Sequence, residues 1–418
     1  MFHRAALPLV LTASCLVVPA STSSADAFTP GSRGLGDSYF PLEGNGGYNA
    51  AHYDLNLSYA PKTDRLAGSV RMTAHATKNL SRFNLDLRGL KVTSVKVNGR
   101  RATFSRSGQE LRIAPARGLV KGHTFTTTVR YGGVPRTIVG SPIVFGSPYG
   151  FLHTPDGAFV GGEPNGASTW FPVNDHPSDK ASYKIKITVP KGLGAISNGV
   201  LTGRRTQGAR TSFTWKQRQP MASYLATIDI GKWKVKSGRT PGGIRNYIAV
   251  DPKLRAGSLS YVTKATARAT DFWVSTLGPY PFDTTGAIVD DARYRGRPLG
   301  FSLETQSKPV YSAVRDTGTI AHELAHQWFG DSVSVKRWKD IWLNESFATW
   351  AMYYWLEKKR PGALTVGEQV RADYADWAPV KRYWTVKIAD PGRNTMFSSR
   401  VYDGGAMVLQ FLRERIGD

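Results

Sequence analysis

Hydrophobic and polar residues alternate along much of the chain between residues 48 and 250. Clear examples are His52–Leu57, Gly68–Ala74, Thr124–Val129 and Tyr183–Val189. Successive side chains of a strand point to opposite faces of a sheet, so this alternation predicts strands with one face in a core. Gly and Asn residues separate the runs, as they do in antiparallel sheets. We therefore expect a large antiparallel β domain over residues 48–250.

The spacing of apolar residues becomes helical after residue 251. Apolar positions recur every three to four residues, which predicts helices that bury one face. The expected helices cover residues 259–277, 317–330, 341–359 and 401–416, with a strand-like stretch within 284–312. Residues 251–418 therefore form a second domain. The last helix is followed directly by Asp418, and we expect the sequence to be a fragment of a longer protein.

The first 27 residues have the pattern of an export signal. Arg4 precedes a mostly apolar run over residues 5–20, and Ala25-Asp26-Ala27 fits a small-residue cleavage site. We predict a signal peptide over residues 1–27, a secreted protein and no stable membrane insertion after cleavage. An uncleaved anchor is the alternative, although the apolar run is short for a membrane span. Residues 28–47 are rich in Gly, Ser and Pro and predict a flexible lead-in.

Charge and cysteine content narrow the chemistry. The chain has 55 Lys and Arg residues against 31 Asp and Glu residues, a formal net charge of +24. These cations are scattered along the strand-rich half without a basic helix or an aromatic RNA-binding motif, so we expect a solvated basic surface and no nucleic-acid partner. Cys15, the only cysteine, lies in the predicted signal peptide. A metal ion in the mature chain must therefore be held by His and carboxylate side chains.

One segment, His322-Glu323-Leu324-Ala325-His326, carries the pattern H-E-x-x-H. Positions i and i+4 share one face of a helix, so His322 and His326 reach the same ion. Zinc accepts two imidazole nitrogens and a carboxylate and keeps a fourth position for water. Eighteen residues separate His326 from Glu345, which lies on the next predicted helix. We predict one Zn²⁺ per chain, held by His322, His326 and Glu345.

The role of Glu323 follows from its neighbours. It adjoins His322 in sequence and cannot ligate the same ion. Zinc lowers the pKa of a bound water toward neutrality, and a carboxylate then takes the proton as the water attacks a carbonyl carbon. We predict that Glu323 is this base and that it returns the proton to the leaving amine.

From residue 48 to residue 417 the chain resembles the aminopeptidase N family of gluzincin metallopeptidases. The segment Trp342-Leu343-Asn344-Glu345-Ser346-Phe347-Ala348 is similar to the family's second zinc motif, with Ser346 where Gly is usual. Trp170-Phe171-Pro172-Val173-Asn174-Asp175 and Gly278-Pro279-Tyr280-Pro281 resemble further landmarks. The resemblance implies a saddle-like antiparallel β-sheet domain followed by a thermolysin-like α/β zinc-peptidase domain. It also implies that the family's C-terminal helical domain is absent or truncated here.

The resemblance implies three further site residues. Glu163, twelve residues before Asp175, and Glu304 match family carboxylates that bind the free α-amine of the substrate. Glu304 lies in an altered motif, because Phe301 and Thr305 replace the usual Gly and Asn of G-A-M-E-N. The segment Val401-Tyr402-Asp403-Gly404-Gly405-Ala406 matches the family's tyrosine motif, which makes Tyr402 the donor to the oxyanion of the transition state.

These residues together predict a secreted zinc aminopeptidase that acts on peptides with a free N-terminus. An N-terminal ammonium group needs anionic partners beside the metal, and Glu163 and Glu304 supply two carboxylates. The altered segment around Phe301 and Thr305 keeps other hydrolases open, namely a zinc endopeptidase or an epoxide-type hydrolase. A non-catalytic binding protein on a degenerate peptidase fold is an alternative from another class.

Overall fold

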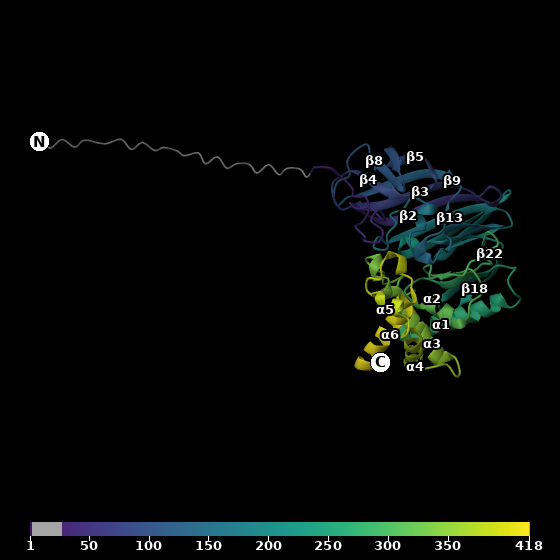
Figure 1. Ribbon diagram of the computed structural model, residues 1–418. Coiled ribbons are helices and arrows are strands. Elements are labelled where there is room, and N and C mark those ends of the chain that lie inside the picture. Colours follow the sequence, from purple (N-terminus) through teal and green to yellow (C-terminus); the bar gives the residue numbers. More distant parts are fainter. Residues whose placement is uncertain (2–26, 418) are drawn as a thin grey trace.

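The computed structural model describes Met1 and residues 27–417 and has two parts, a β-rich N-terminal part and a helix-rich C-terminal part (Figure 1). The predicted signal peptide falls almost entirely on residues 2–26, which lie outside the described residues. Among the described helices, none has both the length and the apolar character that a bilayer crossing requires.

An eight-stranded sheet dominates the N-terminal part. Its strands run in the order β15-β16-β13-β2-β3-β9-β5-β6, and all neighbours are antiparallel except β2 and β13, which are parallel. Every second residue is buried, as Tyr53, Leu55 and Leu57 show on β2. The strands are β2 (Tyr48–Ala60), β3 (Arg65–Ala76), β5 (Lys91–Val97), β6 (Arg100–Arg101), β9 (Thr124–Gly133), β13 (Ala181–Pro190), β15 (Val200–Gln207) and β16 (Arg210–Met221).

Two smaller sheets complete the β domain and share its core. The four-stranded sheet has the order β1-β4-β8-β7, and the five-stranded sheet has the order β10-β11-β12-β17-β14. Trp170, Trp215 and Tyr53 are fully buried in the common core. The strands are β1 (Thr29–Pro30), β4 (Leu80–Asp86), β7 (Thr103–Ser107), β8 (Glu110–Ala114), β10 (Thr137–Ile138), β11 (Tyr149–Thr154), β12 (Gly157–Gly161), β14 (Gly194–Ser197) and β17 (Ile228–Gly231).

The structure corrects the predicted boundary after residue 250. β18 (Lys234–Arg239) and β19 (Arg245–Val250) belong to the sheet of the α/β domain, because β19 pairs in parallel with β20 (Thr285–Val289). This sheet has the order β18-β19-β20-β24-β23. Alternation reveals a strand but not its hydrogen-bonding partner, so the boundary moves to the segment between β17 and β18. The short strands nearby are β21 (Arg293–Tyr294), β22 (Arg297–Pro298), β23 (Ser302–Leu303) and β24 (Val310–Tyr311).

Four of the helices agree with the predicted ones to within a few residues, except at one end. The second predicted helix ends at Ala325 rather than at Gly330, because the chain turns back after the second histidine of the H-E-x-x-H segment. The four helices are α1 (Ser258–Leu277), α2 (Thr317–Ala325), α3 (Trp342–Lys359) and α6 (Ser399–Ile416).

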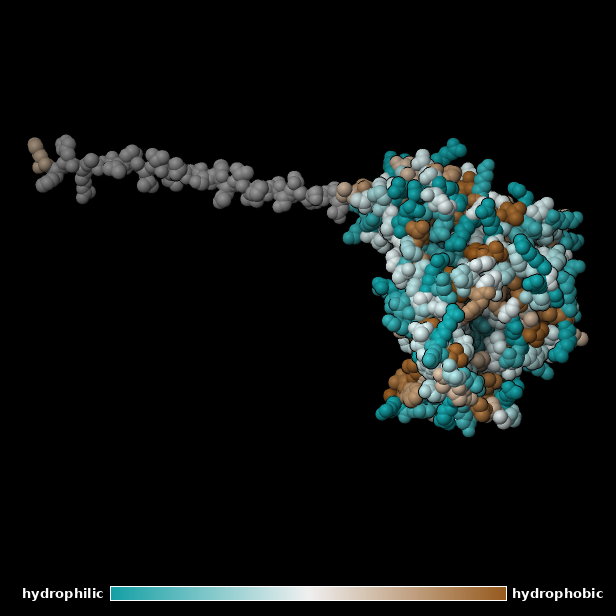
Figure 2. Space-filling view, viewed as in Figure 1, coloured by the Kyte–Doolittle hydropathy of each residue, from teal (hydrophilic) through white to brown (hydrophobic). Residues whose placement is uncertain are grey.

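Two helices were not expected, α4 (Val366–Trp377) and α5 (Lys381–Thr385). α4 has only Val366 and Val370 fully buried, so its apolar pattern is too thin to detect. It begins with a capping box between Thr365 and Glu368 and packs on α3 and α6. The outer face of α6 leaves apolar side chains exposed near the C-terminal end, where Figure 2 shows hydrophobic surface at the lower edge of the molecule. These side chains are Val408, Phe411, Leu412 and Ile416.

Residues 28–47 are packed against both domains and do not form a flexible lead-in. The carboxylate of Asp37 accepts a hydrogen bond from the backbone N–H of Trp338 at 2.9 Å, and the Phe40 ring lies edge-on to the Trp338 ring. The Tyr39 hydroxyl donates to Asp390 of the α/β domain at 2.5 Å. Gly, Ser and Pro supply the turns of this segment, whereas Asp37, Tyr39 and Phe40 supply buried contacts that composition alone does not show.

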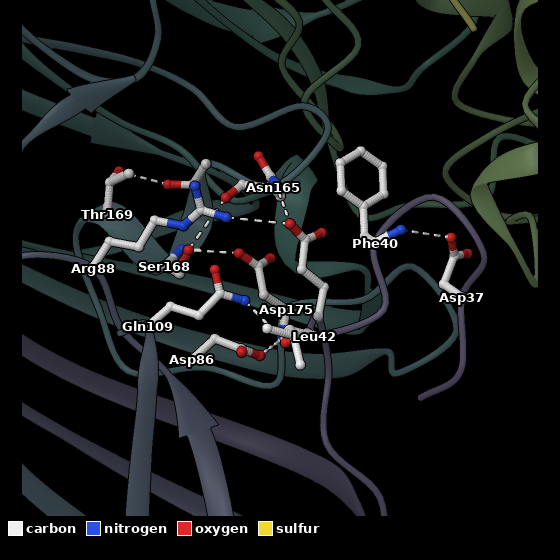
Figure 3. A network of polar contacts seen from close by, with 12 residues as sticks. Asp37, Phe40, Leu42, Asp86, Arg88, Gln109, Asn165, Ser168, Thr169 and Asp175 are labelled. Atoms are coloured by element: carbon white, nitrogen blue, oxygen red, sulfur yellow. Dashed lines mark hydrogen bonds and ion pairs between the residues drawn. The ribbon is translucent and has the colours of Figure 1, made fainter. Parts of the chain in front are cut away.

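A buried polar network joins this segment to the strand domain (Figure 3). Arg88 contacts Glu43 at 3.2 Å, and Asn165 donates to the same carboxylate. Asp175 accepts from the backbone N–H of Ser168 at 3.0 Å. The network therefore holds the loop between residues 163 and 170, which begins with the predicted amine-binding carboxylate.

Candidate active site

Helix α2 begins at a well-defined cap. Asp316 accepts hydrogen bonds from the backbone N–H groups of Gly318 at 2.8 Å and Thr319 at 3.1 Å, which pairs donors that helix geometry leaves free. Trp273 of α1 donates its indole N–H to the carbonyl oxygen of Ala321 at 2.9 Å. α2 is therefore fixed at its start and along its buried side, which sets the direction of the two histidines that follow.

The three predicted metal ligands come together at the junction of α2 and α3. The Nε2 atoms of His322 and His326 are 3.1 Å apart, and Glu345 Oε2 lies 3.5 and 3.4 Å from them. Donors at 2.0–2.1 Å from a tetrahedral zinc ion lie about 3.3 Å from one another. The triangle of donor atoms, two imidazole nitrogens and one carboxylate oxygen, therefore fits a zinc ion.

The charges at this triangle also favour a cation. Burial raises the pKa of Glu345, but His326 and His322 lower it more, so the pKa of Glu345 falls to about 2. Burial lowers the pKa of His326, whereas Glu345 and Glu304 raise it to about 10. A field that holds a proton this firmly on a buried imidazole also attracts a divalent metal ion.

The backbone orients one of the ligands. His326 donates its Nδ1–H to the carbonyl oxygen of Phe329 at 3.0 Å, which leaves Nε2 free to bind a metal. Phe329 reaches this position because α2 ends at Ala325 and the following residues turn back. Sequence reasoning did not identify this partner, since a backbone carbonyl carries no signal in the side-chain pattern.

Four carboxylates surround the same small volume. Oxygen atoms of Glu163, Glu304 and Glu345 lie within 4.8 Å of one another, and Glu304, Glu323 and His326 form a second such group. Burial raises the pKa of Glu163 and Glu323 well above the ordinary value, and it raises the pKa of Glu304 to about 7. Within the described residues, the Oε1 atoms of Glu163 and Glu304 are buried without a hydrogen-bond partner.

Tyr402 of α6 stands beside the histidines. Its ring lies parallel to that of His322, with ring centroids 6.2 Å apart and planes at 11°. Burial raises the pKa of Tyr402 well above its ordinary value, so the phenol keeps its proton and is a hydrogen-bond donor. The structure thus brings all seven predicted site residues to one place.

A pocket of about 370 Å³ opens next to Glu163 and Tyr402. Phe301 forms part of its wall, with its ring 5.8 Å from the ring of Phe159. A Cβ atom added to Gly161 would lie 2.7 Å from the Phe301 ring, so this phenylalanine fills the space above a glycine of β12. Thr305 is buried and donates its hydroxyl to the carbonyl oxygen of Lys308, which ties the segment after Glu304 into a turn.

Two family models match the chain in the order that the two domains require. A Peptidase M1 N-terminal domain matches residues 49–225, and a Peptidase family M1 domain matches residues 299–418. The chain belongs to peptidase family M1, the aminopeptidase N family. The site therefore lies in the second of two domains that follow the M1 order, in a family of zinc metallopeptidases.

Relatives within M1 resemble the chain at moderate identity. A leucyl aminopeptidase of Saccharolobus solfataricus is 27% identical over 401 residues, which are 88% of this chain and 47% of that protein. The tricorn protease-interacting factor F2 of Thermoplasma acidophilum is 28% identical over 272 residues, which are 61% of this chain and 34% of that protein. The chain spans about half the length of two curated relatives that match 88% of it.

Solved structures of an M1 zinc metallopeptidase from Deinococcus radiodurans share the fold. One has a TM-score of 0.81 at 29% identity and covers 92% of this chain and 86% of that chain. A mutant of that enzyme bound to a Tyr-Ser-Ala substrate has a TM-score of 0.80. The expected order, a strand domain followed by an α/β zinc-peptidase domain, is confirmed.

Ser346 connects α3, which carries the predicted metal ligand Glu345, to α6, which carries Tyr402. Its hydroxyl donates to the carbonyl oxygen of Val401 at 2.7 Å, and a Cβ atom on Gly405 would lie only 1.8 Å from the Ser346 oxygen. Ser346 therefore fastens α3, next to Glu345, to α6, next to Tyr402.

Gln327 was not singled out from the sequence, although it directly follows a metal ligand. It is fully buried, and its side chain donates to the carbonyl oxygen of Glu304 at 3.0 Å and accepts from the N–H of Ser307 at 2.6 Å. One side chain thus fixes the backbone on both sides of the dipeptide Thr305-Gln306 that follows Glu304. Its place directly after a ligand histidine is the one signal that the sequence offers, and only the structure shows its partners.

We predict that Gln327→Ala lowers the free energy of unfolding by about 1–3 kcal/mol, because two buried backbone groups lose their partners. Glu304 then loses its fixed position, so KM for aminoacyl substrates rises more than kcat falls. Chemical denaturation and steady-state kinetics measure both effects. Gln327→Glu is the companion variant, since it keeps the acceptor for Ser307, removes the donor and adds a charge when ionised. Equal stability of wild type and Gln327→Ala would contradict this role.

Proposed function

We propose that the protein is a zinc aminopeptidase that removes the N-terminal residue of peptides with a free α-amine. The observation that carries this proposal is the position of Glu163 and Glu304 beside Glu345, with carboxylate oxygens within 4.8 Å of one another. An ammonium group placed among these oxygens supplies the hydrogen-bond donors that the two buried Oε1 atoms lack within the described residues. A substrate without a free amine would leave these carboxylates buried and uncompensated.

The amine site also sets which bond is cut. Glu163 belongs to the strand domain and Glu304 to the α/β domain, so a peptide amine is held from two sides next to the metal ligands. A substrate fixed by its first amine presents its first carbonyl to His322, His326 and Glu345. The peptide bond after the first residue is therefore the one that is cut, as an aminopeptidase requires.

His322, His326 and Glu345 hold the zinc ion in this proposal. When bound, zinc supplies Lewis acidity and lowers the pKa of a water molecule toward neutrality. Glu323 takes the proton of the attacking water and passes it to the departing amine, because its carboxylate lies among the same group of donors. Tyr402 donates its hydroxyl hydrogen to the oxygen of the carbonyl under attack.

The relatives support the same reaction. The Saccharolobus protein is named a leucyl aminopeptidase, and a mutant of the Deinococcus enzyme is bound to a Tyr-Ser-Ala substrate. The pocket beside Glu163 and Tyr402 has apolar walls formed by Phe301, Leu303 and Phe397. The first side chain of the peptide enters this pocket in the proposal.

Substrates with free and blocked termini test the reaction. The zinc-loaded protein is assayed with a panel of aminoacyl p-nitroanilides and with the same compounds N-acetylated, together with internally quenched peptides and an epoxide substrate. We expect hydrolysis only where the α-amine is free. Cleavage of blocked peptides at comparable rates would overturn the proposal in favour of an endopeptidase, and hydrolysis of epoxides alone would favour the other hydrolase class.

Glu304→Gln is predicted to reduce kcat/KM for aminoacyl substrates by about 10–100-fold. The basis is the loss of one charged hydrogen bond, worth about 1.5–3 kcal/mol. Most of the loss falls on KM, because the interaction with the amine exists before and during the reaction. Steady-state kinetics on free and N-acetylated substrates measure it. Glu163→Gln is the matched control for the second carboxylate and shifts KM in the same direction, whereas an unchanged KM in both variants would contradict amine binding.

We also propose that the protein is exported. The support is the pattern of residues 1–27 and the packed chain that begins directly after it, with β1 at Thr29–Pro30. Expression of the full sequence followed by N-terminal sequencing of protein from the medium tests this. The expected first residue is Phe28, and full-length protein retained in the cells would count against export.

A further inference from the structure

The outer face of the eight-stranded sheet gathers cations that are far apart in the sequence. Strands β2, β3, β9 and β13 lie side by side in the upper part of the molecule (Figure 1). On β13, Lys184 lies opposite Lys216 of β16 and opposite Asp54 of β2. Asp54 in turn lies opposite Arg71 of β3. One row across four strands thus holds three cations and one acid.

The next row continues the pattern. Lys186 on β13 lies opposite Asn56 of β2, which lies opposite Ser69 of β3, and Ser69 lies opposite Arg130 of β9. These positions point outward, because the residues between them, such as Ile185 and Val70, are buried. We call the outward cations of these strands the basic face: Arg71, Arg130, Lys184, Lys186, Arg210 and Lys216.

Negative charge does not balance this face. Within the eight strands, all of which the structure describes, Asp54 is the only acidic residue. It pairs with Lys184 at 3.1 Å and leaves the other cations of the face uncompensated within the sheet. Like charges directly opposite each other, as Lys184 and Lys216 are, destabilise a sheet. The stability of the sheet therefore gains nothing from placing Lys184 opposite Lys216.

One end of the basic face is hollowed. A depression of about 560 Å³ lies over β13, β15 and β16, and its walls include Lys186, Arg205 and Arg210. The hydroxyl groups of Thr188, Ser212 and Thr214 belong to the same lining. The depression therefore combines cations with neutral hydrogen-bonding groups, and its lining residues include no carboxylate.

We propose that the basic face binds an anionic polysaccharide. Neighbouring strands are about 4.8 Å apart, so the paired Lys184 and Lys216 present two cations within one strand spacing to the acidic groups of such a polymer. The hydroxyl and amide groups between the cations suit the hydroxyl groups of sugars. Association releases the counterions of the polymer, which makes the binding strongly dependent on salt.

The face is less suited to other polyanions. Proteins that bind single-stranded nucleic acid place aromatic rings under the bases, but every Phe, Tyr and Trp of the eight strands is buried. Proteins that bind bilayer surfaces insert apolar side chains, and the rows described above carry polar ones. A polysaccharide needs neither feature.

Labelled dextran sulfate and a labelled polygalacturonate are the probes, with neutral dextran as the uncharged control. The full chain is titrated with each at a series of NaCl concentrations, and the two anionic probes distinguish sulfate from carboxylate chemistry. We expect at least one of the two anionic probes to bind at low salt, and we expect neutral dextran not to bind. Absence of binding to both anionic probes would overturn the proposal.

A triple variant, Arg71→Gln with Arg130→Gln and Lys186→Gln, tests the location. We expect binding at least tenfold weaker and a salt dependence reduced by roughly two to three charges, since each cation contributes about one. The matched control removes three exposed cations of the α/β domain, Lys236→Gln with Lys264→Gln and Arg268→Gln, and is expected to bind within about twofold of wild type. Equal weakening in both variants would show that net charge alone acts and would overturn the proposal.

Two further measurements keep the result unambiguous. Hydrolysis of an aminoacyl substrate must be unchanged in both variants, which shows that they are folded and that the basic face is separate from the peptidase site. If the triple variant does not fold, the double variant Lys186→Gln with Lys216→Gln takes its place. Tighter binding of a single-stranded oligonucleotide or of phosphatidylglycerol vesicles through the same residues would overturn the polysaccharide in favour of that partner.

Discussion

Glu323→Gln is expected to lower kcat about 10²–10⁴-fold, the contribution of a well-placed general base and acid. The amide cannot accept the proton of the attacking water, yet it has nearly the same size and fits the same buried position. Glu323 binds no metal in our proposal, so KM and zinc content should remain close to those of the wild type. Steady-state kinetics and metal analysis of the purified variant measure these quantities.

Stability distinguishes this loss from a folding defect. Burial raises the pKa of Glu323 well above its ordinary value, which means that the folded protein disfavours the charged form. A neutral amide at this position avoids that cost, so Glu323→Gln should unfold at the same denaturant concentration as the wild type or at a higher one. A variant that keeps its full rate would exclude Glu323 as the base, and one that loses zinc would place Glu323 among the ligands.

Tyr402→Phe is expected to lower kcat about 10²–10³-fold, the usual cost of removing one donor to an oxyanion. The phenylalanine keeps the ring that lies parallel to His322 and removes only the hydroxyl group. Because the developing charge exists only in the transition state, KM should change little. Kinetics on one aminoacyl p-nitroanilide at saturating zinc give both constants.

A second tyrosine offers a matched control for this prediction. Tyr383 is buried near α6, and its ring stacks on the Trp377 ring with centroids 4.5 Å apart, not on a metal-ligand histidine. Tyr383→Phe should therefore leave kcat unchanged. If Tyr402→Phe raised KM and kept kcat, Tyr402 would bind the ground state of the substrate rather than the oxyanion.

Both predictions depend on direct contacts between the segments that carry the site residues. Ser346 joins the helix of Glu345 to the helix of Tyr402, and Gln327 joins the helix of His326 to the segment of Glu304. Each contact connects residues that the chemistry uses together. The spacing of chemical groups in the site is therefore set by buried hydrogen bonds between elements, and not by the elements alone.

The metal ligands could be predicted from the sequence because their geometry is local. His322 and His326 are four residues apart on a helix, and 3.6 residues per turn places them on one face wherever that helix lies. The third ligand, Glu345, required only that a second helix pack beside the first. The strands of the β domain could be predicted equally well, because an alternating pattern specifies which residues of a strand are buried.

Other features depended on distant partners. β18 and β19 have the same alternation as the strands before them, and only hydrogen bonding to β20 places them in the α/β domain. Residues 28–47 have the composition of a loop, yet Asp37 and Phe40 are buried by contacts with Trp338. Composition indicates the conformations that a segment favours by itself, whereas its burial depends on the surface of the rest of the protein against which it packs.

The sequence by itself determined the chemical groups of this M1 peptidase and the elements that carry them, since helix and strand periods act within a few residues. Tertiary structure decided how those elements approach one another. It placed Glu163 from one domain beside Glu304 from the other, and it turned the chain after Ala325 so that the carbonyl oxygen of Phe329 orients His326. It also collected cations such as Arg71, which are scattered in the sequence, onto one face, because strand pairing joins residues that the chain itself keeps far apart.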